Sequence, residues 1–165
     1  MKKYKKWCYW IPAVVMMVVI FLFSAADGEE SSELSTGVTE QVIGIVNDVC
    51  QLEMTDAQKI EANETLEFYV RKTAHFTEYM ILAFCMLLAL KKCHGIYGRK
   101  LYVLAFVFTV TYAASDELHQ SFVGGRSPQF RDVLIDGSGA LAAVLVYLLI
   151  AGCIVTKSID KKQGM

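Results

Sequence analysis

The chain turns polar between two long apolar runs, at Ala113-Ala-Ser-Asp-Glu-Leu-His-Gln-Ser-Phe-Val-Gly-Gly-Arg126. This stretch holds two acids, a histidine, a glutamine and an arginine at a point where a membrane-spanning helix would be ending. An ionisable side chain at membrane depth costs about 2.5–3.5 kcal/mol, so a group of them indicates either a functional site or tight pairing between helices.

Four runs of the chain are long and apolar enough to cross a bilayer core about 30 Å thick. They cover about residues 9–26, 73–90, 101–119 and 132–155. The 165-residue chain is 55% hydrophobic and contains two prolines, which is typical of one compact helical membrane domain. The sequence therefore predicts an all-α membrane protein, with a four-transmembrane-helix bundle formed by residues 1–165 as a single domain.

Charge is sorted along the chain. Residues 27–67 contain eleven acids and one lysine, whereas residues 1–6, the turn 91–100 and the tail after Cys153 are basic. Short basic loops stay on the cytoplasmic side of a membrane. We therefore expect both termini in the cytoplasm, and the acidic segment 27–70 and the loop 120–131 outside. No nucleotide-binding loop or internal repeat is present, and nothing indicates a nucleic-acid partner.

The first apolar run has a second interpretation. A lysine-rich start, an apolar stretch and the small-residue end Ser24-Ala-Ala26 also describe a secretory signal peptide. Cleavage would leave three spans and place the new N-terminus outside. The length of the run, and Trp7 and Trp10 as interfacial anchors, favour a retained span.

The external segment 27–70 is predicted to be helical and amphipathic. Apolar residues recur at helical spacing at Val38, Val42, Ile45, Val46, Val49 and Cys50. Thr55 and Gln58 fit a capping box, and no Gly or Pro interrupts the following helix before Gly95. This extracytoplasmic segment is expected either to cap the bundle at the membrane interface or to act as a lid over a site.

Helical spacing brings polar residues of all four predicted spans to one depth, at the outer leaflet. The second span presents Lys72, His75, Glu78 and Tyr79, the third presents Tyr112, Ser115, Asp116 and His119 with Glu117 and Gln120 beside them, the fourth presents Asp132, Asp136 and Gly139, and the first presents Ser24. Ser127 and Pro128 are suited to begin the fourth span. His94, in the basic turn, is expected to be solvated.

Several chemistries fit this set of residues. A phosphate or pyrophosphate could meet Arg126 and Lys72, with His119 and His75 as proton-transfer groups oriented by Asp116 and Asp136. A divalent metal could bind the histidines and carboxylates, although no tight ligand spacing supports it, and the cofactor stays unknown. A pocket for a lipid-linked or drug-like ligand needs no catalysis, so whether the chain is an enzyme stays open. Each residue could also serve as an interfacial anchor or as a bond between helices.

The candidate site residues fall into two groups. Catalytic candidates are His75, His119, Asp116, Asp136, Glu78 and Glu117; substrate-binding candidates are Lys72, Arg126, Gln120, Tyr79, Asp132 and Ser24.

Three motifs together resemble the VanZ-like family of small polytopic bacterial membrane proteins. They are Arg71-Lys72-x-x-His75-Phe76-x-Glu78-Tyr79, Asp116-Glu117-x-His119-Gln120-x-Phe122 with Gly125-Arg126, and Asp132-x-x-x-Asp136-x-x-Gly139. The resemblance implies a multi-pass protein of the bacterial plasma membrane with membrane lipids as partners. The family's founding member is associated with resistance to teicoplanin, so the resemblance also implies a cell-envelope context and a link to glycopeptide resistance. It does not imply an oligomeric state. The polar residues themselves favour a site at the outer leaflet that binds or processes a phosphate- or sugar-bearing lipid. The alternative is a non-enzymatic membrane protein that alters antibiotic access or scaffolds envelope partners.

Overall fold

The computed structural model describes residues 4–25, 28–122 and 129–163, and the side chains of 6–25, 36–122 and 129–153. Every regular element in these ranges is helical, so the predicted all-α class is confirmed. In chain order they are α1 (Tyr4–Trp7), the 3₁₀ helix η1 (Cys8–Trp10), α2 (Ile11–Ala25), α3 (Gly28–Cys50), α4 (Asp56–His94), α5 (Gly98–Gln120) and α6 (Phe130–Gln163).

Four helical stretches are long and apolar enough to cross a membrane, as predicted: Cys8–Ala25, Asp56–His94, Gly98–Gln120 and Phe130–Cys153. Large aliphatic side chains remain exposed along their outer faces, including Val14 on α2, Val107 on α5 and Leu145 on α6. Such a surface is stable in hydrocarbon and costly in water. The chain is therefore an integral membrane protein with several spans.

The longest helix, α4, is continuous from Asp56 to His94, as its lack of glycine and proline predicted. The Thr55 hydroxyl accepts from the Gln58 N–H, and the Gln58 side chain accepts from the Thr55 N–H, which confirms the capping box. Gly95 ends the helix at φ 64°, a left-handed conformation that glycine adopts without strain. At 1.5 Å per residue α4 is about 58 Å long, roughly twice the thickness of the bilayer core.

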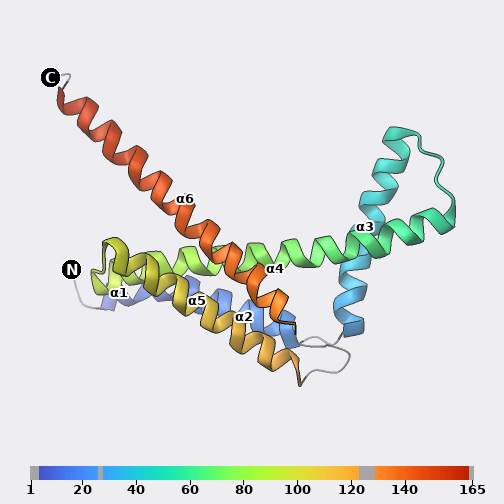
Figure 1. Ribbon diagram of the computed structural model, residues 1–165, viewed down its shortest axis with the longest axis horizontal. Coiled ribbons are helices and arrows are strands. Elements are labelled where there is room, and N and C mark those ends of the chain that lie inside the picture. The colour runs from blue at the N-terminus through green and yellow to red at the C-terminus, as the bar shows by residue number, and fades with distance from the viewer. Residues whose placement is uncertain (1–3, 26–27, 123–128, 164–165) are drawn as a thin grey trace.

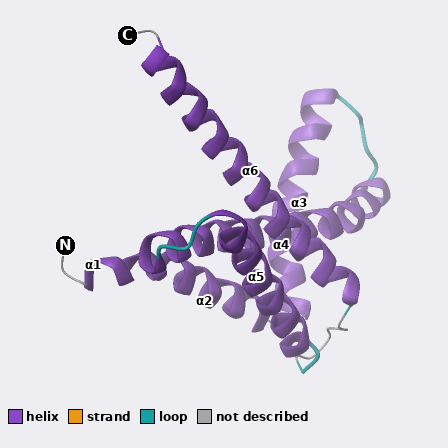
Figure 2. Ribbon diagram, turned by 60° about the vertical axis from the view of Figure 1, so that its left-hand side comes forward, coloured by secondary structure: helices purple, strands orange, loops and turns teal. Residues whose placement is uncertain are grey.

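The spanning half of α4 is the centre of the bundle, with α2, α5 and α6 packed around it (Figures 1 and 2). Tyr79, Leu82 and Leu87 of α4 are fully buried. The crossing of α4 and α6 is close because Gly139 has no side chain: a Cβ there would lie 2.2 Å from the Phe76 carbonyl oxygen. Gly139 thus lets α4 approach α6 closely, as small residues do between membrane helices.

The two ends of the bundle differ in chemistry. At the basic end, α4 ends at His94 and α5 begins at Gly98. At the polar end, α2 ends at Ala25, α5 ends at Gln120 and α6 begins at Phe130. These two names are kept below.

At the basic end, the N-terminal helical turns are fastened to the end of α4. The Trp10 Nε1–H donates to Nε2 of His94 at 3.3 Å, and the rings of Trp7 and Trp10 both meet the imidazole edge-on. The Cys93 thiol donates to the Lys6 carbonyl. His94 is exposed, in agreement with the solvated position predicted for it. Its contacts with the two indole rings were not predicted.

The amphipathic helix α3 packs on the N-terminal part of α4, around Asn63. The side chain of Thr39 bonds to that of Asn63, and Ile43 is buried in the same contact. The apolar stripe of α3 is exposed at Val38, Val42, Ile45, Val46 and Val49. Helix α3 therefore rests on α4 through another side of the helix, and its role as an interfacial cap or as a lid stays a prediction.

Candidate functional site

Polar side chains from all four spanning helices lie at the polar end of the bundle. Those that are buried are Ser24 on α2, Tyr79 on α4, Asp116, Glu117 and Gln120 on α5, and Asp136 on α6. Glu78 and Lys72 on α4 and Asp132 on α6 are partly buried beside them. We call these nine residues the polar cluster. A buried polar group is stable only where it finds partners, so the partners of each member define what the cluster can bind.

An ion pair joins α4 to α6 at the rim of the cluster. The Lys72 ammonium donates to Oδ1 of Asp132 at 2.6 Å, with only 17% and 21% of the two side chains exposed. The same ammonium lies 5.5 Å from the centre of the Phe68 ring. Lys72, predicted to clamp an anion, is thus already neutralised by a carboxylate in this structure.

The last turn of α5 holds two acids with different tasks. Asp116 accepts a hydrogen bond from Nε2 of Gln120, one turn along the helix, at 3.2 Å. Glu117 accepts from the backbone N–H of Gln129, just before α6 begins. The Glu117 carboxylate therefore fixes the end of α5 to the start of α6, a structural task, whereas Asp116 faces the cluster.

The centre of the cluster contains buried polar atoms that make no hydrogen bond with the described residues. They are Oδ1 of Asp136 and the Ser24 hydroxyl. Tyr79 beside them is fully buried, and its hydroxyl has the Asp116 carboxylate as its hydrogen-bond partner and Asp136 nearby. Leaving a buried donor or acceptor unsatisfied costs about 1–3 kcal/mol, so atoms of this kind gather where another molecule completes them.

Negative charge dominates the described part of the cluster. Glu78, Asp116, Glu117, Asp132 and Asp136 are close enough to influence one another, and Lys72 is the cation that acts on them. The nearby Arg71 pairs with Glu67 at 3.9 Å, and Arg131 is exposed, with its guanidinium over the Phe68 ring. An anion entering the centre would meet repulsion, whereas a ligand that presents hydroxyl or ammonium donors would meet acceptors.

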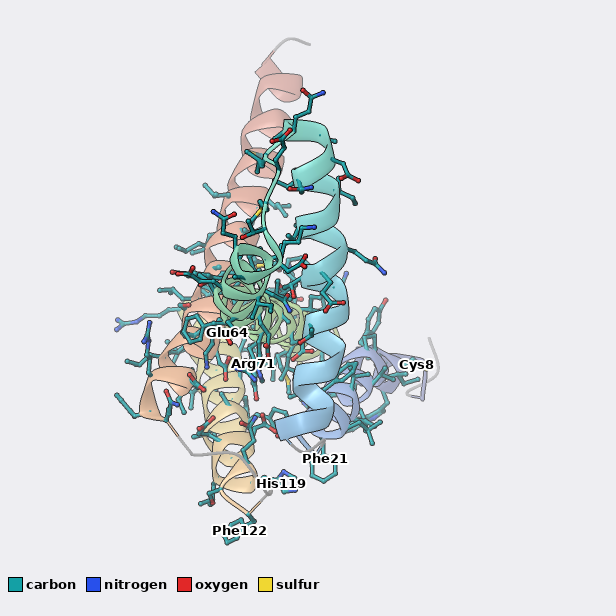
Figure 3. All side chains as sticks on the ribbon, turned by 90° about the vertical axis from the view of Figure 1, so that its right-hand side faces the viewer. Cys8, Phe21, Glu64, Arg71, His119 and Phe122 are labelled. Atoms are coloured by element: carbon teal, nitrogen blue, oxygen red, sulfur yellow. The ribbon has the colours of Figure 1, made fainter. Side chains whose placement is uncertain are left out.

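The two predicted proton-transfer groups do not occupy equivalent positions. The His119 ring packs on Phe21 of α2 with ring centres 4.8 Å apart, and Figure 3 shows both rings at the end of the bundle near Phe122. Nδ1 of His119 makes no hydrogen bond with the described residues, so Asp116 does not orient it here. His75 is half-buried on α4, one turn before Tyr79.

A family model described as VanZ/LLP1 matches residues 9–151. The chain belongs to the VanZ/LLP1 family. No curated protein and no solved structure gives a significant match. The matched range contains all nine residues of the polar cluster and confirms the family resemblance seen in the three motifs.

Part of the site predicted for this VanZ/LLP1 protein lies outside the described residues. These are Arg126, the Gly124-Gly125 turn before it, and the Ser127-Pro128 start of the last span. Among the residues that are described, no group of three or more His, Cys, Asp and Glu side chains has an arrangement that could hold a metal ion. The acids of the cluster are spread over three helices.

No role for Tyr112 was predicted from the sequence, but in the structure it connects two helices. Its hydroxyl donates to the Met17 carbonyl at 2.6 Å, tying α5 to α2 below the cluster. Its ring lies 6.4 Å from that of Tyr79. The only sequence signal is that Tyr112 precedes Asp116 by one helical turn and so shares its face.

Proposed function

We propose that this VanZ/LLP1 protein is a cell-envelope protein whose polar cluster binds the headgroup of a lipid-linked ligand carrying a sugar or a phosphate. One observation carries the proposal: Oδ1 of Asp136 and the Ser24 hydroxyl are buried at the end of a four-helix membrane bundle, and neither makes a hydrogen bond with the described residues. A headgroup at this depth would supply the missing bonds while its hydrocarbon chain stayed among lipids.

The charge pattern supports an outer-leaflet position for the cluster. The basic end carries the lysines and arginine of residues 91–100, and the acidic segment 27–67 joins helices at the polar end. Under the positive-inside rule the basic end faces the cytoplasm, which puts both termini there and the cluster at the opposite surface of the plasma membrane.

The charge balance favours a sugar over a bare phosphate as the group that enters the centre. Carboxylates accept hydrogen bonds from sugar hydroxyls, and the central oxygens belong to Asp116 and Asp136. A phosphate on the same lipid would sit at the rim, where Lys72, Arg71 and Arg131 lie and where Arg126 is expected. In this arrangement His75 and His119 are the candidates for proton transfer to or from the ligand.

Binding by purified protein in nanodiscs tests the proposal. The probes are an undecaprenyl-phosphate-linked monosaccharide, undecaprenyl phosphate and undecaprenol. We expect the sugar-bearing probe to bind most tightly, and Asp136→Asn or Tyr79→Phe to weaken it by about 10-fold or more, the loss of one hydrogen bond to a charged group.

Ser138→Ala is the matched control, because that exposed hydroxyl on α6 bonds to the Ile135 carbonyl of its own helix. Its affinity should equal that of the parent. If no probe binds the parent protein, or if Asp136→Asn and Tyr79→Phe bind as tightly as Ser138→Ala does, the proposal fails.

A second candidate is a non-enzymatic role in glycopeptide susceptibility, possible for a member of a family linked to teicoplanin resistance. The specific observation behind it is the uncovered apolar stripe of α3, which stands beside the polar end. Such a protein would alter access of the drug to the membrane surface. Expression should then lower teicoplanin susceptibility equally for the parent and for Asp136→Asn, and removal of the stripe should abolish the effect.

A further inference from the structure

The apolar stripe of α3 is long, regular and uncovered. Val38, Val42, Ile45, Val46 and Val49 follow the spacing of one helix face and are 44–77% exposed, and Leu52 continues the stripe beyond the helix. Because an exposed apolar surface of this kind is costly in water, another apolar surface is expected to cover the stripe. Nothing in the described residues covers it.

The other faces of α3 contact α4 or are exposed and polar. Thr39 and Ile43 pack on α4, and Asn47 accepts a hydrogen bond from the Met54 N–H in the link to α4. At 100° per residue Thr39 and Ile43 lie about a quarter turn from the centre of the stripe. Glu40 is exposed and lies roughly opposite the stripe, and the exposed Asp48 lies on the flank of α3 that faces away from α4.

The chain holds α3 at the surface of the bilayer. The first span ends at Ala25 and α3 begins at Gly28, so at most about 11 Å of chain separates them. Figure 1 shows α3 lying across the direction of α4 at the polar end, so it lies close to the membrane plane. A helix in that plane, touching an upright helix on its flank, directs a face a quarter turn away along the membrane normal, either into the bilayer or away from it, and the chemistry of the stripe decides between the two.

We infer that α3 is an interfacial membrane helix whose Val38–Val49 stripe is buried in the acyl-chain boundary of the bilayer that the protein spans. The stripe is purely aliphatic, whereas protein–protein interfaces are enriched in aromatic side chains and arginine, so hydrocarbon fits it better than a second protein surface does. Glu40 and Asp48 then face water. Because α3 contains five acids and no lysine or arginine, its insertion depends on apolar burial and not on anionic headgroups.

Tryptophan quenching by brominated lipid tests the inference on the full chain in phosphatidylcholine vesicles. In a Trp7→Phe, Trp10→Phe background, Val42→Trp reports on the stripe and Glu40→Trp is its matched control on the opposite face. We expect the Val42→Trp emission to be blue-shifted and to lose most of its intensity in bromolipid, and the Glu40→Trp emission to keep both its red-shifted maximum and its intensity. Replacing part of the lipid by phosphatidylglycerol should not increase the quenching.

Two outcomes would overturn the inference. Equal, weak quenching of both reporters would mean that the stripe faces water. A blue-shifted Val42→Trp emission that bromolipid does not quench would mean that protein, such as a second copy of the chain, covers the stripe. Circular dichroism and gel filtration of both variants show that each is folded, and neither result depends on whether the polar cluster binds a ligand.

Discussion

At the scale of single residues, Asp136 and Tyr79 show a conflict between stability and binding. Both are buried in an acidic neighbourhood; Tyr79 has the Asp116 carboxylate as its partner, whereas Oδ1 of Asp136 makes no hydrogen bond with the described residues. A residue kept for folding alone would be expected to have its partners within the bundle. The cost of keeping Oδ1 of Asp136 unpaired is typical of sites that are held ready for a ligand.

Asp136→Asn removes a buried carboxylate that lies near Asp116 and Asp132. Because like charges repel and a neutral amide loses less hydration on burial, we expect the melting temperature in mild detergent to stay unchanged or to rise by about 3 °C. Thermal unfolding of the parent and the variant measures it. A fall of many degrees would show that Asp136 holds the helices together, which contradicts a ligand-binding task.

Lys72→Ala leaves Asp132 mostly buried without its cation. We expect the free energy of unfolding to fall by about 2 kcal/mol, less than the loss seen for a fully buried pair because a fifth of each side chain reaches solvent. The double variant Lys72→Met with Asp132→Leu should recover most of this loss, since it removes both charges. Denaturant unfolding of the three proteins measures the effect, and equal stability of Lys72→Ala and the parent would contradict it.

The residue-level site could be predicted only in part. Spacing of three or four residues brought Lys72, Tyr79, Asp116 and Asp136 to one depth, because the face of a helix follows from its period. The partner of each side chain depends on how separate helices cross. The spacing of residues within one helix gives no information on that crossing. The pairing of Lys72 with Asp132 and the stacking of His119 on Phe21 were therefore not foreseen.

At the scale of elements, the crossing of α4 and α6 depends on Gly139. A Cβ at this position would lie 2.2 Å from the Phe76 carbonyl oxygen, which is backbone and cannot turn aside. We expect Gly139→Ala to separate the helices and to destabilise the protein by about 1–3 kcal/mol.

Gly137→Ala is the control for that experiment, on the same helix. Its Cβ would lie 3.6 Å from Cγ2 of Val110, an ordinary contact, so the variant should be as stable as the parent or slightly more so. Thermal unfolding measures both proteins. If Gly139→Ala melts with the parent, the two backbones are not in close contact.

The existence of each element was easier to predict than its packing. The Thr55 capping box and the unbroken sequence up to Gly95 indicated α4 and its ends, because caps and breakers are local. The stripe on α3 was equally visible, but an apolar stripe does not say whether protein or lipid covers it. That ambiguity explains why the sequence left open whether the segment is an interfacial cap or a lid.

At the scale of the whole molecule, the arrangement predicts where the ends of the chain lie. Four spans return the C-terminus to the side of the membrane from which the N-terminus starts, and Figure 1 shows both termini toward the basic end. We expect green fluorescent protein fused after Met165 to fluoresce, and alkaline phosphatase fused there to be inactive. The opposite pair of results would mean that the orientation is reversed.

The unbroken length of α4 has a mechanical consequence. One rigid rod contains Asn63, which bonds to α3, and also Phe76 and Tyr79, which contact α6 and the polar cluster. A bilayer that becomes thinner or more curved would change the depth of α3 and tilt this rod about the Phe76–Gly139 crossing, since no hinge lies between them. The geometry of the cluster is thereby coupled to the tension of the surrounding membrane.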